Sequence, residues 1–373
     1  MKIMHVVGAR PNFMKVSPII REMRSQGTFR QTLVHTGQHY DEKMSRIFFE
    51  ELGMAKPDID LEIGSGSHAQ QTARIMSAFE PVLLADRPDL LLVAGDVNST
   101  LACSLVASKL HIPIAHVEAG LRSFDREMPE EINRLMTDVL SDLLFTTSPE
   151  AEDNLHREGV SPEKIFFVGN TMIDTLLRLR EQAASSDVLP KWGIHDGQYA
   201  LATLHRPSNV DQEAVFREIM QALQEIGQDL PVIFPVHPRT RERIAQLGFQ
   251  TCEQASDKGI CLLEPLGYLD FMQLMMRSKM VLTDSGGIQE ETSILNIPCL
   301  TIRENTERPI TVSQGTNRLV GTRKENILQA ARETLNPDRK KSAQIALWDG
   351  KAASRIVSII RQWGRREIDG RSP

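Results

Sequence analysis

The sequence predicts an α/β protein with two doubly wound parallel-sheet domains and an interdomain cleft. Short β-branched apolar runs alternate with helical patterns along almost the whole chain, which is typical of parallel sheets covered by helices on both faces. The 373 residues exceed what one compact core usually holds. The alternation pauses at the polar stretch 181–197, which resembles a linker, and then restarts. Ligands of such domains bind at the carboxyl ends of the strands.

The first predicted domain spans residues 1–180. Its strands are expected at six apolar runs: Ile3–Val7, Gln31–His35, Leu90–Ala94, Ile114–Val117, Leu143–Thr146 and Ile165–Val168. Its helices are expected at Pro18–Arg24, Asp41–Leu52, Ala69–Ala85, Glu130–Leu140 and Asn170–Arg180.

The second predicted domain spans residues 181–351. Its strands are expected at Tyr199–Leu204, Val232–Val236, Cys261–Leu263, Met280–Thr283, Cys299–Thr301 and Arg318–Val320. A last helix, about Ala352–Trp363 within residues 352–373, is expected by analogy to cross back onto the first domain.

Composition narrows the class of protein. A hydrophobic content of 41% with 25% charged residues is typical of globular proteins. The net charge of −6 argues against nucleic acid or an anionic membrane as the main partner. We expect no positively charged leader with an apolar core and no membrane span, since no apolar run reaches the ~20 residues that a span needs. The scattered cysteines Cys103, Cys252, Cys261 and Cys299 are expected to be reduced core thiols of a cytoplasmic protein.

Two strand-to-helix turns predict anion sites. Asp284-Ser285-Gly286-Gly287 follows a predicted strand and opens a helical pattern, so free N–H groups and the positive end of the helix dipole would face a phosphate. In the first such loop, Arg10 and Lys15 flank a helix start at Pro11, where cations oppose the dipole unless an anion binds. The alternative for residues 284–287 is an ordinary strand–helix turn. The alternative for Arg10 and Lys15 is that both are solvated surface cations.

Three acids are expected to gather at one edge of the first sheet. Asp96 and Glu118 follow consecutive strands, and Glu130 lies in the first turn of the next helix. Carboxylates gathered in this way can take up and deliver protons. Asp96 could instead be a helix N-cap, and the helix dipole alone could explain Glu130.

Basic residues follow the strands of the second domain. His205 and His237 each come just after a strand and are followed closely by an arginine, which predicts a diphosphate cradle, and Arg308 adds a later cation. A single such histidine is more often structural.

Two further patterns are set aside. The stretch 64–69 matches a loose dinucleotide fingerprint, but no acid closes a second strand at the right distance, so NAD is not expected. His35, His39 and His68 lack metal spacing to any nearby acid, so no metal is expected.

Taken together, these stretches resemble the non-hydrolysing UDP-N-acetylglucosamine 2-epimerases, which have two Rossmann-like domains in the glycosyltransferase-B arrangement. The resemblance covers nearly the whole chain. It rests on GARPNFMK at 8–15, GDVNST at 95–100, HVEAGLRS at 116–123, MPEEINR at 128–134, HRP at 205–207, HPRTR at 237–241, DSGGIQEE at 284–291 and TERP at 306–309.

The resemblance implies a cytoplasmic, homodimeric isomerase of polysaccharide biosynthesis that needs no cofactor. It implies that a base removes the C2 proton while UDP leaves C1, giving a bound 2-acetamidoglucal, and that C2 is then reprotonated from the other face. The residues implied to be catalytic are Asp96, Glu118, Glu130 and His205. Those implied to bind substrate are Arg10, Lys15, Arg134, His237, Phe271 near the uracil, Ser285, Gly286, Gly287, Glu291 at the ribose, and Arg308.

Departures from the family pattern leave alternatives open. Some members bind a regulatory substrate molecule through a QHR motif and a later basic residue. Here Gln38-His39 is followed by Tyr40-Asp41, and residues 57–73 contain no Lys or Arg, which counts against that regulation. The QHYD and HRP variants also resemble relatives that act on diacetamido-uronic acid sugars. A hydrolysing 2-epimerase, a glycosyltransferase and a nucleotide-sugar sensor are further alternatives; the three acids argue against the last two.

Overall fold

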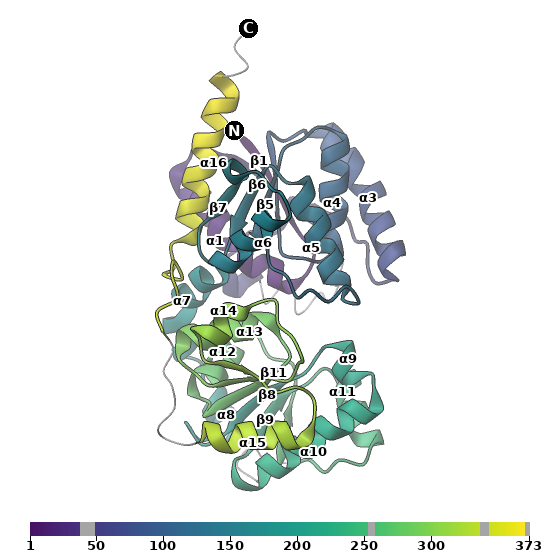
Figure 1. Ribbon diagram of the computed structural model, residues 1–373, viewed down its shortest axis with the longest axis vertical. Coiled ribbons are helices and arrows are strands. Elements are labelled where there is room, and N and C mark those ends of the chain that lie inside the picture. The colour runs from purple at the N-terminus through teal and green to yellow at the C-terminus, as the bar shows by residue number, and fades with distance from the viewer. Residues whose placement is uncertain (38–48, 253–257, 336–342, 370–373) are drawn as a thin grey trace. The chain divides into compact units, whose positions relative to one another are not determined.

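The computed structural model describes residues 1–37, 49–252, 258–335 and 343–369. The chain divides into two compact units, which we call unit 1 (Met1–Arg178 with Ala346–Pro373) and unit 2 (Leu179–Ile345). Each unit is built on one parallel sheet with helices packed against it (Figure 1). The predicted fold class of two doubly wound parallel-sheet domains is therefore confirmed.

The sheet of unit 1 has the order β3-β2-β1-β4-β5-β6-β7. Its strands are β1 (Lys2–Val7), β2 (Arg30–His35), β3 (Ile59–Asp60), β4 (Leu90–Ala94), β5 (Ile114–Ala119), β6 (Leu143–Thr146) and β7 (Ile165–Phe167). Its helices are α1 (Arg10–Gln26), α3 (His68–Ala85), α4 (Asn98–Lys109), α5 (Pro129–Leu140), α6 (Pro149–Arg157) and α16 (Ala352–Asp369), with a 3-10 turn at Pro162–Lys164. Helix α7 (Thr171–Ala184) begins in unit 1 and ends in unit 2. The strand order reverses between β1 and β4, so the loops after these two strands diverge and leave space for a ligand.

The sheet of unit 2 has the order β10-β9-β8-β11-β12-β13, which repeats the arrangement of unit 1. Its strands are β8 (Ala200–Thr203), β9 (Val232–Pro235), β10 (Ile260–Leu263), β11 (Met280–Thr283), β12 (Cys299–Thr301) and β13 (Asn317–Leu319). Its helices are α8 (Val188–Trp192), α9 (Pro207–Val210), α10 (Glu213–Asp229), α11 (Pro238–Gln246), α12 (Tyr268–Arg277), α13 (Gly286–Leu295), α14 (Pro309–Ser313) and α15 (Lys324–Thr334). Here the reversal lies between β8 and β11.

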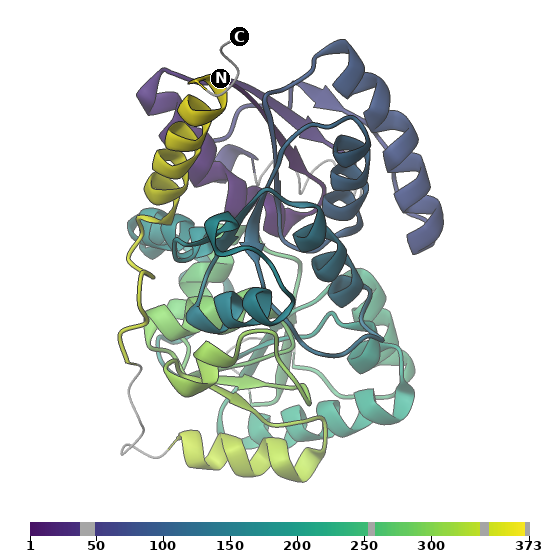
Figure 2. The ribbon, with the colours of Figure 1, turned by 45° about the horizontal axis from the view of Figure 1, so that its top comes forward.

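The C-terminal helix α16 belongs to unit 1, where it packs beside α1 (Figure 2). The Asp174 carboxylate of α7 accepts hydrogen bonds from the first backbone N–H groups of α16, at Ala352 (3.1 Å) and Ala353 (2.7 Å). Trp348 Nε1 donates to the Thr147 carbonyl at 2.8 Å just before the helix. A carboxylate from another helix therefore caps α16 and fixes its start.

Four sequence expectations need correction. The helical stretch expected at Pro18–Arg24 is too short, because α1 spans Arg10–Gln26 with Pro18 inside it, in agreement with the helix start expected at Pro11. The stretch 181–197 is not a plain linker, because α7 continues to Ala184 and α8 lies within it. The short strand β3 was not predicted. Cys252 and Cys261 form a disulfide, while Cys103 and Cys299 are buried free thiols.

Residues 41–48 of the helix predicted at Asp41–Leu52 lie outside the described part of the chain, as does the Gln38–Asp41 motif. None of the described helices combines the length and apolar character that a membrane span requires.

Candidate active site

The loop after β1 is tied to the end of β4 by one buried side chain. Asn12 Oδ1 accepts from the backbone N–H groups of Gly8 (3.1 Å) and Ala9 (2.9 Å), while Asn12 Nδ2 donates to the Ala94 carbonyl at 2.7 Å. The two loops at the strand-order reversal of unit 1 are thus held together. The side chain of Arg10, predicted to bind phosphate in this loop, is outside what the structure describes.

Glu118 lies on a β-bulge at the end of β5. The pairing of β5 with β6 shifts register between Val117 and Ala119, and Glu118 has a φ of +73°. A side chain in this left-handed region is uncommon and strained, and such strain is often found at functional sites. The bulge turns the Glu118 carboxylate onto the Lys15 ammonium, and both side chains are buried. Lys15 is therefore the counter-ion of a predicted acid and not a solvated surface cation.

Asp96, after β4, is held by the buried Arg134 of α5. Arg134 also donates to Glu131 Oε2 at 2.7 Å, and Glu131 accepts from the backbone N–H groups of Ser123 and Phe124, each at 2.9 Å. Burial favours the neutral form of Glu131, but these N–H groups and Arg134 outweigh it and lower the pKa of Glu131. The structure thus brings Asp96 and Arg134 together, with Arg134 turned inward and bound to carboxylates.

Glu130 occupies the first turn of α5 and is partly exposed. It makes no hydrogen bond or ion pair with any residue in the described part of the chain. Glu130 and Arg134 are four residues apart and therefore share a face of α5. The structure places Glu130 on the helix that holds Asp96, but it does not join Glu130 to the other two acids by a direct contact.

In unit 2, the loops after β8 and β11 meet at the buried Asp284. Its carboxylate accepts from the backbone N–H of His205 (3.1 Å) and of Arg206 (2.9 Å), and it faces His205 Nδ1 at 2.8 Å. Loss of water on the side of the ring that faces the buried Asp284 opposes the charged imidazolium, but the Asp284 carboxylate outweighs this effect and raises the pKa of His205. The same contacts lower the pKa of Asp284 despite its burial. The His205 side chain is 63% exposed, so its Nδ1 contacts the buried Asp284 while the rest of the ring faces solvent.

Asp284 is predicted from the sequence only as part of a turn, and its contact with His205 is not predicted. Its place directly before Ser285 and directly after a buried strand is the signal that could have identified it.

The turn Ser285-Gly286-Gly287 opens α13 with no acidic residue in its first turn. A Cβ at Gly286 would lie 2.3 Å from Arg308 Nη1 and 2.7 Å from Glu307 Oε1, so a side chain here would displace the ends of this ion pair. Arg308 is buried and pairs with Glu307 and, at 2.8 Å through Nε, with Glu290. Arg308, which was predicted to bind substrate, is therefore buried near the start of α13 and paired with Glu290 and Glu307.

Glu291, predicted at the ribose, is buried on α13 and accepts a hydrogen bond of 2.7 Å from the Tyr268 hydroxyl. Burial, with the neighbouring Glu290 charge, raises the pKa of Glu291 to about 7, although the Tyr268 hydrogen bond acts in the opposite direction. Phe271 follows on the same helix as Tyr268 and is partly buried. His237 is the exposed N-cap of α11, with its Nδ1 accepting from the Arg239 N–H at 3.4 Å.

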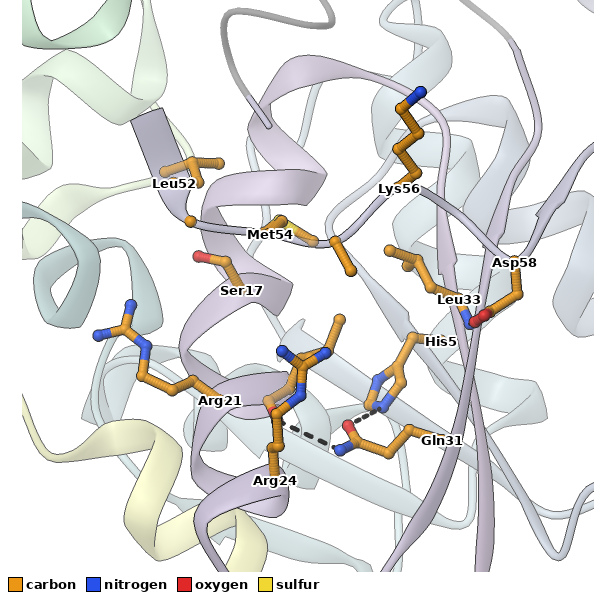
Figure 3. Close-up of a pocket in the computed structure, with 13 residues that line it drawn as sticks. His5, Ser17, Arg21, Arg24, Gln31, Leu33, Leu52, Met54, Lys56 and Asp58 are labelled. Atoms are coloured by element: carbon orange, nitrogen blue, oxygen red, sulfur yellow. Dashed lines mark hydrogen bonds between the residues drawn. The ribbon is translucent and has the colours of Figure 1, made fainter. Parts of the chain in front are cut away.

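A separate cavity of about 150 Å³ lies in unit 1 between α1 and residues 52–58 (Figure 3). His5 lines it, and burial lowers the pKa of His5 to about 4 while His5 Nε2 lies 2.9 Å from Gln31 Oε1. None of the residues that line this cavity is a predicted site residue. Among the described side chains, no group of three His, Cys, Asp or Glu is placed to hold a metal ion.

Comparison with known proteins identifies the family. The model of the UDP-N-acetylglucosamine 2-epimerase family matches residues 21–361. The UDP-N-acetylglucosamine 2-epimerase of Methanocaldococcus jannaschii is 45% identical over 96% of this chain and 99% of its own. The UDP-2,3-diacetamido-2,3-dideoxy-D-glucuronate 2-epimerase of Pseudomonas aeruginosa is 44% identical, over 96% of this chain and 99% of its own.

A crystal structure of the Methanocaldococcus jannaschii epimerase in complex with UDP-GlcNAc and UDP is similar with a TM-score of 0.89 at 44% identity, covering 97% of this chain and all of that one. The matches run through the strands and loops that carry the acids of unit 1 and the helix start of unit 2. The chain belongs to the UDP-N-acetylglucosamine 2-epimerase family.

Proposed function

We propose that this protein interconverts UDP-N-acetylglucosamine and UDP-N-acetylmannosamine without net hydrolysis. The observation that carries the proposal is the pair of acids Asp96 and Glu118, which lie at the carboxyl ends of neighbouring strands of unit 1 and are each paired with a cation of the same unit. Epimerisation at C2 needs proton transfer on both faces of the sugar, and hence more than one acid–base group.

The proposed reaction begins when a carboxylate accepts the proton from C2. The electrons of that C–H bond form the C1–C2 double bond, and the C1–O bond breaks with its electron pair leaving on UDP. In the second half, a UDP oxygen attacks C1 and C2 takes a proton on the opposite face. Asp96, Glu118 and Glu130 are the proposed proton-transfer groups; Arg134 pairs with Asp96, and Lys15 pairs with Glu118.

Unit 2 is proposed to bind UDP. The backbone N–H groups of Gly286 and Gly287 at the start of α13 suit a diphosphate, whereas the Ser285 N–H donates to the Thr283 hydroxyl at 3.0 Å. His205 presents a positive edge that would stabilise the departing phosphate charge. Glu291 is assigned to the ribose hydroxyls, and Phe271 to the uracil. Arg10 and His237 are proposed as further phosphate contacts, whereas the inward pairing of Arg308 favours a role in shaping the helix start.

A second candidate substrate is a UDP-2,3-diacetamido-uronic acid, since a relative of that name is 44% identical to this chain. The C2 chemistry would be the same. Side-by-side assays of the two UDP-sugars decide between them through the ratio of their kcat/KM values.

Incubation with UDP-N-acetylglucosamine in D₂O tests the reaction type. Deuterium at C2 of recovered UDP-sugar is the expected result, because the proton removed exchanges with solvent before C2 is reprotonated. Free UDP together with N-acetylmannosamine would instead indicate a hydrolysing enzyme. Unlabelled UDP-sugar with neither product would indicate a transferase or a sensor.

Replacement of Glu118 by glutamine tests the proposed base. Gln has the same shape but cannot accept a proton from carbon, so we expect Glu118→Gln to reduce C2 deuterium exchange by about 10²- to 10⁴-fold. UDP affinity, measured by calorimetry, should stay close to the wild-type value because UDP is assigned to unit 2. Glu127→Gln, an exposed carboxylate nearby in sequence, is the matched control and should exchange normally. Near-normal exchange in Glu118→Gln would remove Glu118 from its role.

We further propose that the protein is a homodimer that works in the cytoplasm. The apolar side chains exposed on α3 and α5 support the first part.

A further inference from the structure

A buried carboxylate lies behind the acids of unit 1 and reaches the backbone beside two of them. Asp138, on the third turn of α5, is buried. Its Oδ1 accepts from His116 Nδ1 at 2.6 Å, and its Oδ2 accepts from the Gly120 backbone N–H at 3.0 Å and from Arg122 Nη2 at 2.7 Å.

The first branch of this network fixes the residue that follows the bulge at Glu118. Gly120 has a φ of +79°, and a Cβ there would lie 2.3 Å from the Ala151 carbonyl oxygen. Asn154 Nδ2 also donates to the Gly120 carbonyl at 2.9 Å. Both the N–H and the carbonyl of Gly120, two residues beyond Glu118, are therefore fixed by hydrogen bonds from side chains.

The second branch fixes the residue before Asp96. His116 donates through Nε2 to the Gly95 carbonyl at 2.9 Å, while the Gly95 N–H donates to the Val117 carbonyl at 3.0 Å. A carbonyl and a carboxylate can only accept, so both ring nitrogens of His116 act as donors. The His116 imidazole thus links the Asp138 carboxylate to the Gly95 carbonyl, so the position of Gly95 depends on that of Asp138.

Helix α5 joins these branches to the third acid. Glu130, Arg134 and Asp138 are spaced by four residues and share one face of the helix. Arg134 holds the side chain of Asp96, while Asp138 holds the backbone before it. A shift of α5 would therefore move all three acids together.

Asp138 itself is unsuited to proton transfer. Burial alone would raise its pKa, but the charges of His116 and Arg122 outweigh burial and lower the pKa of Asp138. Arg122 is in turn neutralised by Glu158, at 2.6 Å. The buried carboxylate is fully engaged by His116, Gly120 and Arg122.

We propose that Asp138 is a positioning residue, which sets Asp96 and Glu118 for C2 proton transfer through His116–Gly95 and through Gly120. The inference rests on the proposed epimerase function. A displacement of about 1 Å in a reacting group can lower a rate about 10²-fold, so the network has a measurable consequence.

The test compares Asp138→Asn with Asp142→Asn. Asp142 Oδ2 accepts from the Ile114 N–H at 3.0 Å, so it makes the same kind of carboxylate–backbone contact at the opposite end of β5. For Asp138→Asn, kcat and C2 deuterium exchange should fall about 10²-fold while KM and UDP affinity change little. For Asp142→Asn, kcat should stay at the wild-type value.

A double mutant separates positioning from general stabilisation. His116→Gln interrupts only the Gly95 branch and should lower kcat by itself. Because both changes act on one path, His116→Gln with Asp138→Asn should be no slower than Asp138→Asn alone. His116→Gln also carries the test if Asp138→Asn does not fold.

The proposal is overturned if folded Asp138→Asn keeps wild-type kcat, if Asp142→Asn loses as much, or if only KM changes. A wild-type protein without C2 exchange would refute the epimerase function instead. In that case, a crystal structure of Asp138→Asn tests the positioning role separately. If Gly95 and Gly120 do not move, the positioning role is refuted.

Discussion

Glu291 is the clearest titrating group of the candidate site, because burial raises its pKa to about 7. An ionised carboxylate can accept hydrogen bonds from two ribose hydroxyls, whereas the protonated form accepts them poorly. If Glu291 binds the ribose, UDP binding requires loss of its proton at low pH. We therefore expect UDP affinity to fall roughly tenfold from pH 8 to pH 6, since a pKa near 7 leaves the carboxyl mostly protonated at the lower pH.

Calorimetric titration with UDP across this pH range provides the measurement. The phosphate of UDP also titrates, so Glu291→Gln serves as the control and should retain only the pH dependence of the ligand. Identical pH profiles for the wild type and Glu291→Gln would show that Glu291 does not couple to the nucleotide. Tyr268→Phe should shift the midpoint to higher pH, because the Tyr268 hydroxyl stabilises the ionised form.

At the same residue scale, the sequence indicated which acids matter but not how they are held. Asp96 and Glu118 could be predicted because each lies at the carboxyl end of a buried apolar run. Their counter-ions Arg134 and Lys15 come from helices distant in sequence, so no local pattern pairs them. Asp138 lies beyond the motif considered, although its four-residue spacing from Arg134 is a signal that could have been used.

At the scale of an element, α1 illustrates how a proline is accommodated inside a helix. Pro18 has no N–H to donate to the Met14 carbonyl, four residues earlier. The hydroxyl of Thr175, on α7, donates to that carbonyl at 2.7 Å. The helix that carries Lys15 is thereby tied to α7 at the point where its own hydrogen bonding is interrupted.

Thr175→Val should therefore destabilise the protein by about 1–3 kcal/mol, because it leaves the buried Met14 carbonyl without that donor. Urea unfolding followed by circular dichroism measures the change. Thr137→Val is the matched control: Thr137 is also buried, and its hydroxyl has no partner among the described residues. A loss in Thr137→Val equal to that in Thr175→Val would mean that the hydrogen bond to Met14 contributes nothing specific.

Most strands could be predicted from the sequence because each is a short apolar run between turn residues. Leu90–Ala94 and Met280–Thr283 are found with the predicted bounds, since both are buried on both faces. The two-residue strand β3 has too few residues to form a pattern. The disulfide between Cys252 and Cys261 joins positions nine apart that β-pairing brings together, a long-range effect that spacing alone did not reveal.

At the scale of the whole molecule, two sheets with one strand order carry complementary chemistry. In each unit, some candidate residues follow the two strands at which the order reverses: Lys15 and Asp96 follow β1 and β4 in unit 1, and His205 and Ser285 follow β8 and β11 in unit 2. Unit 1 adds the carboxylates Glu118, at the end of the neighbouring strand β5, and Glu130, on α5, whereas unit 2 places a histidine and the start of α13 in its two loops. The shared topology explains why the site residues recur at equivalent positions, while the difference in side chains explains the proposed division between proton transfer and UDP binding.

The proposed homodimer would use the helical layer of unit 1. Leu84 on α3 is 64% exposed, and on α5 Val139 is 73% and Met136 43% exposed. Helices α3 and α5 both pack against α4, so they border the same layer (Figure 1). Apolar side chains gathered in this way are typical of a surface that another chain covers.

We expect Val139→Asp to convert the dimer to monomer, because a buried, unpaired carboxylate at an interface is strongly unfavourable. Light scattering coupled to size exclusion measures the mass, and deuterium exchange at C2 shows whether the monomer stays active. Leu335→Asp changes a similarly apolar residue, 38% exposed, in unit 2 and should leave the dimer intact. A Val139→Asp protein that remains dimeric would exclude the α3–α5 layer as the interface, and a wild-type monomer at micromolar concentration would exclude the dimer itself.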